Sequence, residues 1–247
     1  MRTVYLPRES ACTGPLVLVN RAHPLRVRDK TALCAPDESR PGVLMERQAA
    51  RLLQECIRKA GGWDMIVPVS GWRSYTEQQQ IWDGSMAENG EAFTRKYVAL
   101  PGCSEHQTGL AIDLALAAEE IDFIRPDFPY GGICGEFRRV CTAYGFIERY
   151  MRGKEELTGI AAEPWHFRYV GAPHAQLMEE NGLCLEEYSA FIRSAPRSCT
   201  MPGGQTVRVF HVPCAGETTE LLLPDGCCQI SGDNDGGFIV TAWGRSA

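Results

Sequence analysis

The chain has 247 residues, 44% of them hydrophobic and 23% charged, and its formal net charge at pH 7 is −6. This composition is ordinary for a globular protein and excludes a disordered or fibrous chain, and the length suffices for one substantial core with or without a small appendage. Because the net charge is negative and no basic run is interleaved with aromatic residues, we expect a small ligand rather than nucleic acid or an anionic membrane surface as partner.

The N-terminal arm, residues 1–43, carries no recognisable chemistry. Its first twelve residues lack an apolar core of signal-peptide length, and no later stretch approaches the roughly 20 apolar residues of a membrane span. We therefore expect a cytoplasmic protein without a membrane span. The apolar stretch 16–20 predicts a strand. The arm either packs across the core or lies on the surface without a packing role, and the sequence favours neither arrangement.

A helix, a strand and a second helix are predicted next. Apolar residues recur at helical spacing over 44–60, and a Gly-Gly pair follows as a stop signal. Residues 65–70 are typical of a strand that ends close to Arg73. A helix from about Thr76 to Glu88 follows, with Thr76 as its N-cap. Residues 91–101 are predicted to be a connection to the next strand.

The segment Ser104–Asp113 carries the first candidate metal ligands. From Leu110 the apolar residues alternate with small ones, so Asp113 is expected to project from the non-core face of a strand. His106 lies seven residues before Asp113, and an odd separation on one unbroken strand would place the two on opposite faces. They can share an ion only if the chain turns near Gly109, and glycine permits such a turn.

A third candidate ligand lies in the segment 163–170, where aromatic residues alternate with His166 and Arg168. His166 is therefore expected to face away from the aromatic side of a strand. Together with His106 and Asp113 it would form an open catalytic zinc site, with water in the fourth position. Glu163, separated from His166 by a proline bend, is placed to act on that water. Taken singly, each of these residues has a simpler explanation as a hydrogen-bonded or capping group.

The remainder of the chain predicts a helix over 134–144, a strand from Phe146, and two short helices over 173–181 and 185–193. Arg149, Arg152 and Lys154 would suit a phosphate-bearing substrate, although a solvated charged face is the commoner explanation. A region rich in helix and strand breakers, 196–204, precedes several short strands separated by turns. We therefore expect a catalytic domain of residues 1–195 and a small β-rich appendage of residues 196–247.

Eleven cysteines are distributed along the chain without any Cys-x-x-Cys motif, and Cys227-Cys228 is the one adjacent pair. Because no export signal is present, we expect the thiols to be mostly reduced, buried, small hydrophobic groups. A structural zinc site rich in cysteine is not expected.

Three ordered blocks of this sequence resemble the zinc D-alanyl-D-alanine carboxypeptidase family, which includes the VanY, VanX and VanXY peptidases of vancomycin resistance. The first is Ser70-Gly-Trp-Arg-Ser-Tyr-Thr-Glu-Gln78, in which Trp72 replaces the family's usual tyrosine. The second is Ser104-x-His-x-x-Gly-x-Ala-x-Asp113, and the third is Glu163-Pro-Trp-His166. The resemblance covers about residues 44–180 and is closest to the cytoplasmic, bifunctional VanXY type.

The resemblance implies an α+β fold, with helices packed on a mostly antiparallel sheet that carries the zinc site. It also implies roles for seven residues: the zinc ligands His106, Asp113 and His166, the catalytic base Glu163, the charge-stabilising Arg73, and the substrate-binding residues Gln78 and Ser104. The implied cofactor is Zn2+. The implied substrates are small peptides ending in D-Ala-D-Ala, either the free dipeptide or a peptidoglycan precursor.

Three alternatives to a D,D-peptidase remain open from the sequence. An L,D-carboxypeptidase would trim tetrapeptide stems instead of pentapeptides. A metal-containing module would bind cell-wall peptides without cutting them, although Glu163 argues against this function. Finally, the Cys-rich β appendage could make the chain an interaction or redox-responsive subunit. Oligomeric state is not indicated by the sequence.

Overall fold

A computed structural model describes residues 1–26 and 32–244. The chain forms two compact units, Asn20–Cys184 and a second unit that combines Met1–Val19 with Leu185–Ala247. The predicted domains, 1–195 and 196–247, differ from these two units in two places. The N-terminal arm to Val19 belongs with the β-rich unit, and so does the helix that follows Cys184.

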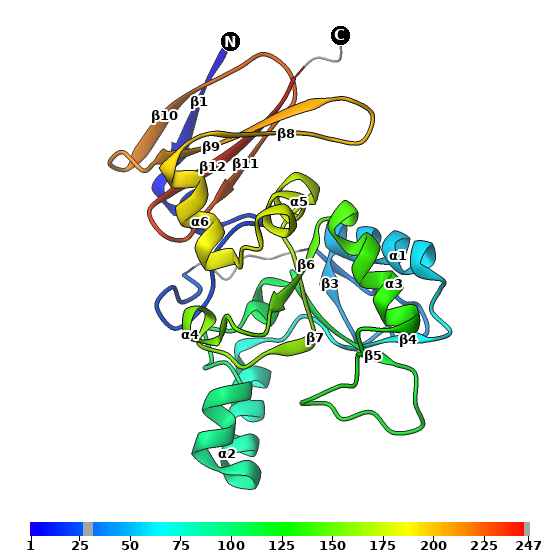
Figure 1. Ribbon diagram of the computed structural model, residues 1–247. Coiled ribbons are helices and arrows are strands. Elements are labelled where there is room, and N and C mark those ends of the chain that lie inside the picture. The colour runs from blue at the N-terminus through cyan, green and yellow to red at the C-terminus, as the bar shows by residue number, and fades with distance from the viewer. Residues whose placement is uncertain (27–31, 245–247) are drawn as a thin grey trace. The chain divides into compact units, whose positions relative to one another are not determined.

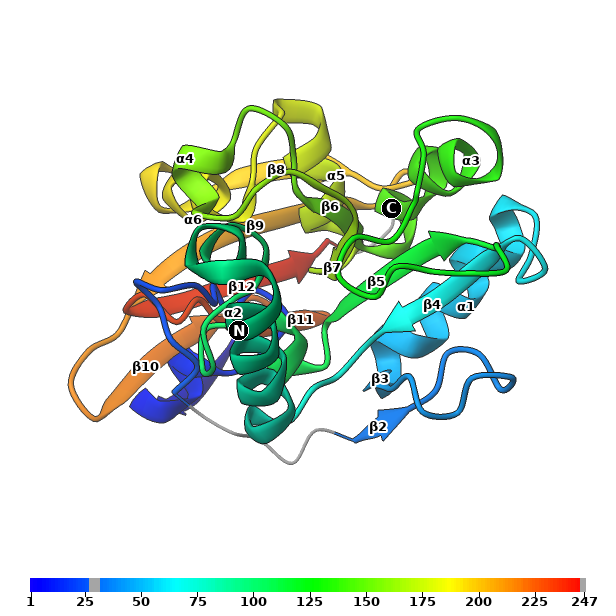
Figure 2. The same cartoon turned by 90° about the horizontal axis from the view of Figure 1, so that it is seen from below.

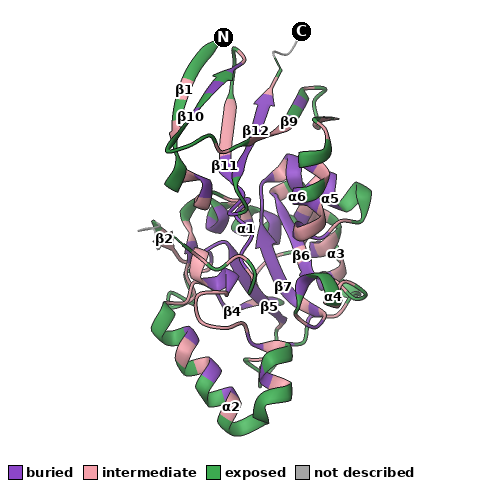
Figure 3. Cartoon of the chain, turned by 90° about the vertical axis from the view of Figure 1, so that its left-hand side faces the viewer, coloured by how far each residue is buried: buried purple, intermediate pink, exposed green. Residues whose placement is uncertain are grey.

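The larger unit is built on a four-stranded antiparallel sheet (Figure 1). Its order is β4 (Ile66–Ser70), β5 (Ala111–Leu116), β7 (Glu163–Tyr169) and β6 (Phe146–Tyr150). The two central strands are β5 and β7, and both are buried along most of their length (Figure 3). Because β4 is an edge strand, it tolerates Pro68, whose nitrogen has no proton to donate to a neighbour.

Two helices cover one face of this sheet, α1 (Arg47–Ala60) and α3 (Gly132–Cys141), which lie next to each other (Figure 1). Figure 2 shows α1 behind β4 and β5. The apolar stripe of α1 packs with Phe137 of α3 and with the apolar side chains of β5 and β7, such as Ile112 and Phe167, in one core. Burial of apolar surface stabilises a fold by about 25 cal/mol per Å2, so this packing holds the sheet in place. The opposite face of the sheet is then free to carry polar groups.

The first helix begins three residues later than predicted, because Met45 and Glu46 form the short strand β3 with Leu33–Cys34 (β2). The Glu46 side chain accepts hydrogen bonds from the backbone of Gln48 and Ala49 and so acts as the N-cap. The helix ends at Gly61, whose φ of 137° is readily available only to glycine.

The second helix, α2 (Tyr75–Tyr97), is longer than the predicted 76–88. Its N-cap is Ser74 and not Thr76, because the Ser74 side chain and the Glu77 side chain complete a reciprocal capping box. A kink at Gly90, with φ 79°, interrupts the helix, and helical structure resumes into the segment predicted to be a connection. The rings of Phe93 and Tyr97, four residues apart and 4.8 Å between centroids, support that last turn.

The remaining elements of the larger unit are short. Three are single turns, η2 (Glu105–Thr108), η3 (Thr142–Tyr144) and α4 (Glu155–Thr158), and α5 (Ala172–Asn181) ends the unit. Within the described residues, no helix is long and apolar enough to cross a membrane.

The smaller unit contains a four-stranded antiparallel sheet and a two-stranded ribbon. The sheet order is β11 (Cys228–Gly232), β12 (Gly237–Trp243), β9 (Thr206–Pro213) and β8 (Arg197–Thr200), and the ribbon pairs β1 (Arg2–Pro7) with β10 (Thr218–Leu223). The turn η1 (Arg8–Cys12) and the helix α6 (Leu185–Ser194) complete it. The pairing of β1 with β10 explains why the arm belongs here, since it joins segments more than 200 residues apart.

The predicted strand over 16–20 is wrong. Leu16–Val19 is buried but irregular, because its backbone bonds to a side chain of β11 and to the residues that follow β11, and not to a neighbouring strand in a ladder. The amide of Leu16 donates to the hydroxyl of Ser231, and the amide of Leu18 donates to the carbonyl of Asp233.

No disulfide bond joins any of the eleven cysteines, all of which lie in the part of the chain that the structure describes. Only four of them are buried, which is fewer than the sequence predicted: Cys56, Cys134, Cys141 and Cys184. The remaining seven are partly or fully exposed, although Cys34 and Cys228 still pack against apolar clusters.

Gly71, which follows β4, provides a test of this packing. A Cβ atom built on Gly71 would lie 2.1 Å from the backbone oxygen of Leu44, which cannot move aside as a flexible side chain would. We expect Gly71→Ala to lower the free energy of unfolding by about 1–3 kcal/mol, as overpacking typically does. Gly42→Ala is the matched control, because nothing lies within 4 Å of its added Cβ. Urea unfolding of both variants measures the difference, and equal stabilities would contradict the proposed clash.

Candidate metal centre and active site

Asp113 and His166 meet across the two central strands of the larger unit. They are directly paired in the ladder between β5 and β7. Leu114 and Phe167, their neighbours in sequence, point into the core, so the alternation of each strand turns Asp113 and His166 to the other face. Both residues are at least 95% buried, and Asp113 Oδ1 lies 3.0 Å from His166 Nδ1.

His106 reaches the same place because the chain turns where the sequence predicted a turn. Residues 105–108 form η2, and Gly109 ends it in the left-handed conformation, with φ 75° and ψ 4°. The chain then enters β5, which carries Asp113. His106 Nε2 consequently lies 3.2 Å from Asp113 Oδ2, although the two residues are separated by an odd number of positions.

An irregularity in β7 brings Glu163 to the site. Glu148 of β6 pairs with Phe167, but Tyr150 pairs with Glu163, so two steps along β6 correspond to four along β7. Pro164 lies within this bulge, where the lack of an N–H proton is tolerated. Glu163 and His166 would face opposite ways on a regular strand. Here Glu163 Oε2 lies 3.8 Å from His166 Nδ1.

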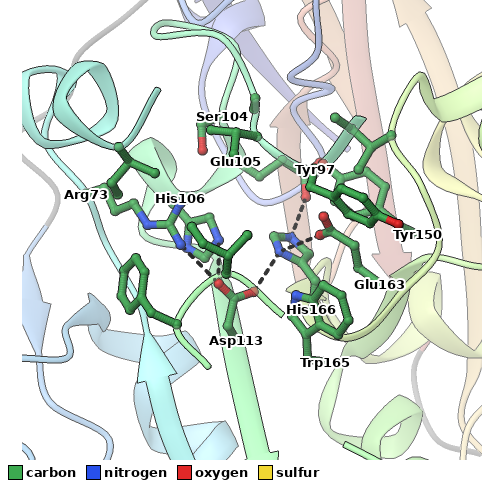
Figure 4. A pocket seen from close by; sticks show the side chains of 16 residues that line it. Arg73, Tyr97, Ser104, Glu105, His106, Asp113, Tyr150, Glu163, Trp165 and His166 are labelled. Carbon is green, nitrogen blue, oxygen red and sulfur yellow. Dashed lines mark hydrogen bonds and ion pairs between the residues drawn. The ribbon is translucent and has the colours of Figure 1, made fainter. Parts of the chain in front are cut away.

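The three predicted metal ligands therefore converge. Ligand atoms of His106, Asp113 and His166 all lie within 4.8 Å of one another, and all three residues are buried (Figure 4). Two imidazoles and one carboxylate form a donor set typical of catalytic zinc, with positions left for water and substrate. The imidazole of His106 is oriented from behind, because its Nδ1 lies 2.7 Å from the carbonyl oxygen of Gly71 and so donates to it.

Burial and neighbouring charges separate the pKa values of the site. Burial, together with the charge of Arg73, lowers the pKa of His106 to about 4. Burial also disfavours a charge on His166, but the carboxylates of Asp113 and Glu105 outweigh it and raise its pKa to about 9. Burial raises the pKa of Glu163 to about 8, with Asp113 adding to the effect and His166 opposing it. A group poised near neutrality suits proton transfer.

Arg73 and Ser104 both line the pocket that contains the three candidate ligands. The guanidinium of Arg73 is fixed on three sides. Its Nε donates to the hydroxyl of Ser70 at 2.8 Å, Nη2 lies 3.0 Å from Asp113 Oδ2, and Nη1 donates to Gln78 Oε1 at 3.3 Å. A cation held in this way is preorganised to meet negative charge that develops beside the metal centre.

Gln78, for which the resemblance implied substrate binding, lies behind Arg73. Its side chain is fully buried and is not part of the pocket lining. The amide nitrogen donates to the carbonyl of Ala99 at 2.8 Å, and the amide oxygen accepts from Arg73. Both ends of the amide are thus engaged within the protein, and one of them supports Arg73.

Three buried charges that the sequence did not reveal as such lie behind the metal centre. Glu105, Arg149 and Arg168 are each at most 1% exposed, and both arginines contact Glu105. Neither interpretation offered for Arg149, a phosphate contact or a solvated face, is correct. For Arg168 the sequence did contain a relevant pattern, because its alternation with aromatic residues predicts that Arg168 lies on the same face of the strand as His166. No pattern in the sequence marked Glu105 as buried.

Comparison with known proteins identifies the family. Residues 43–172 match the family VanY, described as D-alanyl-D-alanine carboxypeptidase. The protein VanXYC of Enterococcus gallinarum, a bifunctional D-Ala-D-Ala dipeptidase and D-Ala-D-Ala carboxypeptidase, is 41% identical over 184 residues, covering 74% of this chain and 97% of that protein. The chain belongs to the VanY family.

Two solved structures extend this result to the fold. The vancomycin-resistance D,D-dipeptidase VanXYg, in complex with a D-Ala-D-Ala phosphinate analogue, matches with a TM-score of 0.96 and 50% identity over 98% of both chains. The D,D-pentapeptidase VanY of a VanB-type resistance cassette, in complex with Zn(II), matches with a TM-score of 0.59 and 32% identity over 71% of this chain and 98% of that one. The predicted α+β fold and the predicted peptidase class of this VanY-family chain are confirmed.

The raised pKa of His166 predicts how metal binding depends on pH. Below a pKa of about 9 the imidazole of this residue is protonated in the metal-free protein and must release a proton before it can donate to a metal. His106, with its pKa near 4, is already neutral. We expect the apparent affinity for Zn2+ to rise about tenfold per pH unit between pH 6 and pH 8.

Competition with a chromogenic chelator across this pH range measures the affinity. Calorimetric titration in buffers of different ionisation enthalpy counts the protons released. An affinity for Zn2+ that does not change with pH, with no proton released, would contradict the protonation state assigned to His166.

Proposed function

We propose that this chain is a zinc-dependent D,D-peptidase that hydrolyses the D-Ala-D-Ala bond of peptidoglycan precursors, as a D,D-carboxypeptidase and also as a D,D-dipeptidase. The observation that carries this proposal is the convergence of His106, Asp113, His166 and Glu163 in one buried pocket. The printed activities of VanXYC and VanXYg support the choice of substrate. In this function the enzyme would contribute to vancomycin resistance by removing D-Ala-D-Ala ends. A cytoplasmic location stays a prediction.

We assign the metal-binding atoms from the contacts of each side chain. His106 would bind through Nε2 and His166 through Nδ1, because these atoms face Asp113 while the other nitrogen of each ring faces away. Asp113 would supply the carboxylate ligand. A zinc ion held by these residues supplies Lewis-acid activation of water and of the peptide carbonyl.

Glu163 is proposed to be the general base and then the general acid. It would take a proton from the attacking water and deliver it to the departing amine. Its buried position favours the protonated form and makes the carboxylate a stronger base, in keeping with a pKa raised to about 8. The presence of this residue in the pocket favours an enzyme over a binding module.

Arg73 is proposed to stabilise the negative charge on the carbonyl oxygen. Its guanidinium borders the pocket and is held by Ser70 and Gln78, so it needs little reorganisation during the reaction. Ser104, which is buried in the pocket lining, is proposed to hold the terminal carboxylate or the backbone of the substrate. For Gln78 we propose only an indirect role, through Arg73.

The substrate assignment is tested by offering the zinc-loaded protein free D-Ala-D-Ala, a pentapeptide precursor and a tetrapeptide in parallel. We expect the dipeptide to be cleaved and one D-Ala to be released from the pentapeptide, with both reactions abolished by a chelator. Cleavage of the tetrapeptide alone would establish an L,D-carboxypeptidase. Binding of the peptides without any cleavage would establish a recognition module, and both outcomes would overturn the proposal.

The role of Glu163 is tested by Glu163→Gln, which keeps the shape of the side chain but removes its basicity. We expect turnover to fall at least 100-fold, because general acid–base catalysis typically contributes that much, while the zinc content stays stoichiometric. Glu148→Gln is the matched control, since Glu148 is another largely buried glutamate of the same sheet that does not line this pocket.

A His106→Ala variant separates the ligand role from the base role. It should lose zinc as well as activity, because one of three protein ligands is missing. Metal analysis by mass spectrometry measures the zinc content of each variant. Near-normal turnover of Glu163→Gln with full zinc content would show that another group is the base.

A further inference from the structure

Glu105 is a buried carboxylate beside the metal centre to which the proposed mechanism gives no role. It precedes His106 in sequence and lies in η2, and its side chain is completely buried. A buried charge is costly unless it is paired, so the contacts of this side chain indicate what it does.

The two oxygens of Glu105 have different surroundings. Oε1 accepts from Arg149 Nε at 2.8 Å and lies 2.8 Å from Arg168 Nη1. Both arginines are completely buried. Oε2 lies 3.7 Å from His166 Nε2, and within the described residues neither of these two buried atoms has a hydrogen-bond partner. Figure 4 shows Glu105 and Asp113 on different sides of the His166 ring.

This arrangement decides which nitrogen of His166 is available to a metal. A neutral imidazole has one N–H group and one lone pair. A carboxylate facing Nε2 stabilises the proton on that nitrogen, and the lone pair then lies on Nδ1. Nδ1 is the nitrogen that faces Asp113 Oδ1 at 3.0 Å and Glu163 Oε2 at 3.8 Å.

His106 is oriented by a different kind of group. His106 donates from Nδ1 to a backbone carbonyl, that of Gly71, and so presents Nε2 to the centre. The two imidazoles thus use opposite nitrogens, and each is fixed through the nitrogen that does not face the centre. For His166 the fixing group is a carboxylate, which itself needs two arginines to remain ionised while buried.

We propose that Glu105, held by Arg149 and Arg168, is a positioning residue that accepts the Nε2 proton of His166 and directs Nδ1 of this ring to the metal. This inference rests on the proposed function, because it assumes that His166 is a zinc ligand. It goes beyond that function because it proposes that the three buried charged residues behind the ligands increase the affinity for the metal. Residues that orient metal ligands typically contribute about 10- to 100-fold to affinity.

A purely structural role is the competing explanation, in which Glu105 only neutralises the two arginines. The two roles differ in what they predict for the ring of His166 and for zinc. A counter-ion affects the stability of the metal-free fold. A positioning residue also sets the tautomer of His166 and the affinity for Zn2+.

The first measurement uses the unaltered protein loaded with Zn2+ and labelled with 15N in its histidines. Long-range 1H–15N spectra distinguish a protonated ring nitrogen from a metal-bound one. We expect His166 to carry its proton on Nε2 and to bind through Nδ1, and His106 to show the opposite pattern. An Nε2 of His166 that is metal-bound, or that carries no proton, would overturn the proposal without any variant having to fold.

The second measurement compares Glu105→Gln with Glu148→Gln. Glu148 also pairs with a largely buried arginine, Arg138, with 3.3 Å between Oε2 and Nε, but it lies outside the pocket. We expect Glu105→Gln to weaken Zn2+ binding about 10- to 100-fold in chelator competition, and its His166 Nε2 proton signal to move upfield. Glu148→Gln should change only the stability of the metal-free protein.

The outcomes separate this inference from the proposed function. If the unaltered protein binds no Zn2+, the ligand assignment fails and the inference fails with it. If the unaltered protein binds Zn2+ and cleaves D-Ala-D-Ala while Glu105→Gln keeps the same Zn2+ affinity, only the positioning role is overturned. A loss of stability in Glu105→Gln without a change in Zn2+ affinity would likewise identify Glu105 as a counter-ion.

Discussion

The carboxylate of Asp113 is the group on which the polar face of this sheet depends. Its Oδ2 contacts both His106 Nε2 and Arg73 Nη2, and its Oδ1 contacts His166 Nδ1. Burial acts to raise the pKa of Asp113, but His106 and His166 outweigh it and hold this pKa well below its usual range. One side chain of a central strand thus joins the segment after β4, the η2 turn and β7.

Burying so much charge is possible because the buried carboxylates and arginines lie next to one another. Three carboxylates, Glu105, Asp113 and Glu163, lie with three arginines, Arg73, Arg149 and Arg168, in and directly behind the site. A divalent cation added to this set leaves an excess of positive charge. Such an excess suits a substrate with a terminal carboxylate and a reaction that develops negative charge on oxygen. The site is therefore electrostatically matched to peptides with a free C-terminus.

Two irregularities of the backbone provide the geometry that regular strands would not. The left-handed Gly109 places His106 and Asp113 on the same side in spite of their odd separation. The bulge at Pro164 does the same for Glu163 and His166. Bulges and positive-φ glycines of this kind are recurrent ways to re-aim side chains at functional sites. The regular remainder of the sheet, packed on α1 and α3, holds these deviations in place.

The sequence by itself determined which residues we propose as metal ligands and base, the turn at Gly109 and most elements of the larger unit. These features follow from residues that are close together in the sequence: alternation along a strand, helical spacing, helix and strand breakers, and three short motifs. Tertiary structure alone decided the burial of Glu105, Arg149 and Arg168, the position of Gln78 behind Arg73, and the pairing of β1 with β10. The physical reason is that burial and pairing depend on segments brought together by folding. A charged residue in a sequence has the same appearance whether it meets solvent or a buried partner far along the chain.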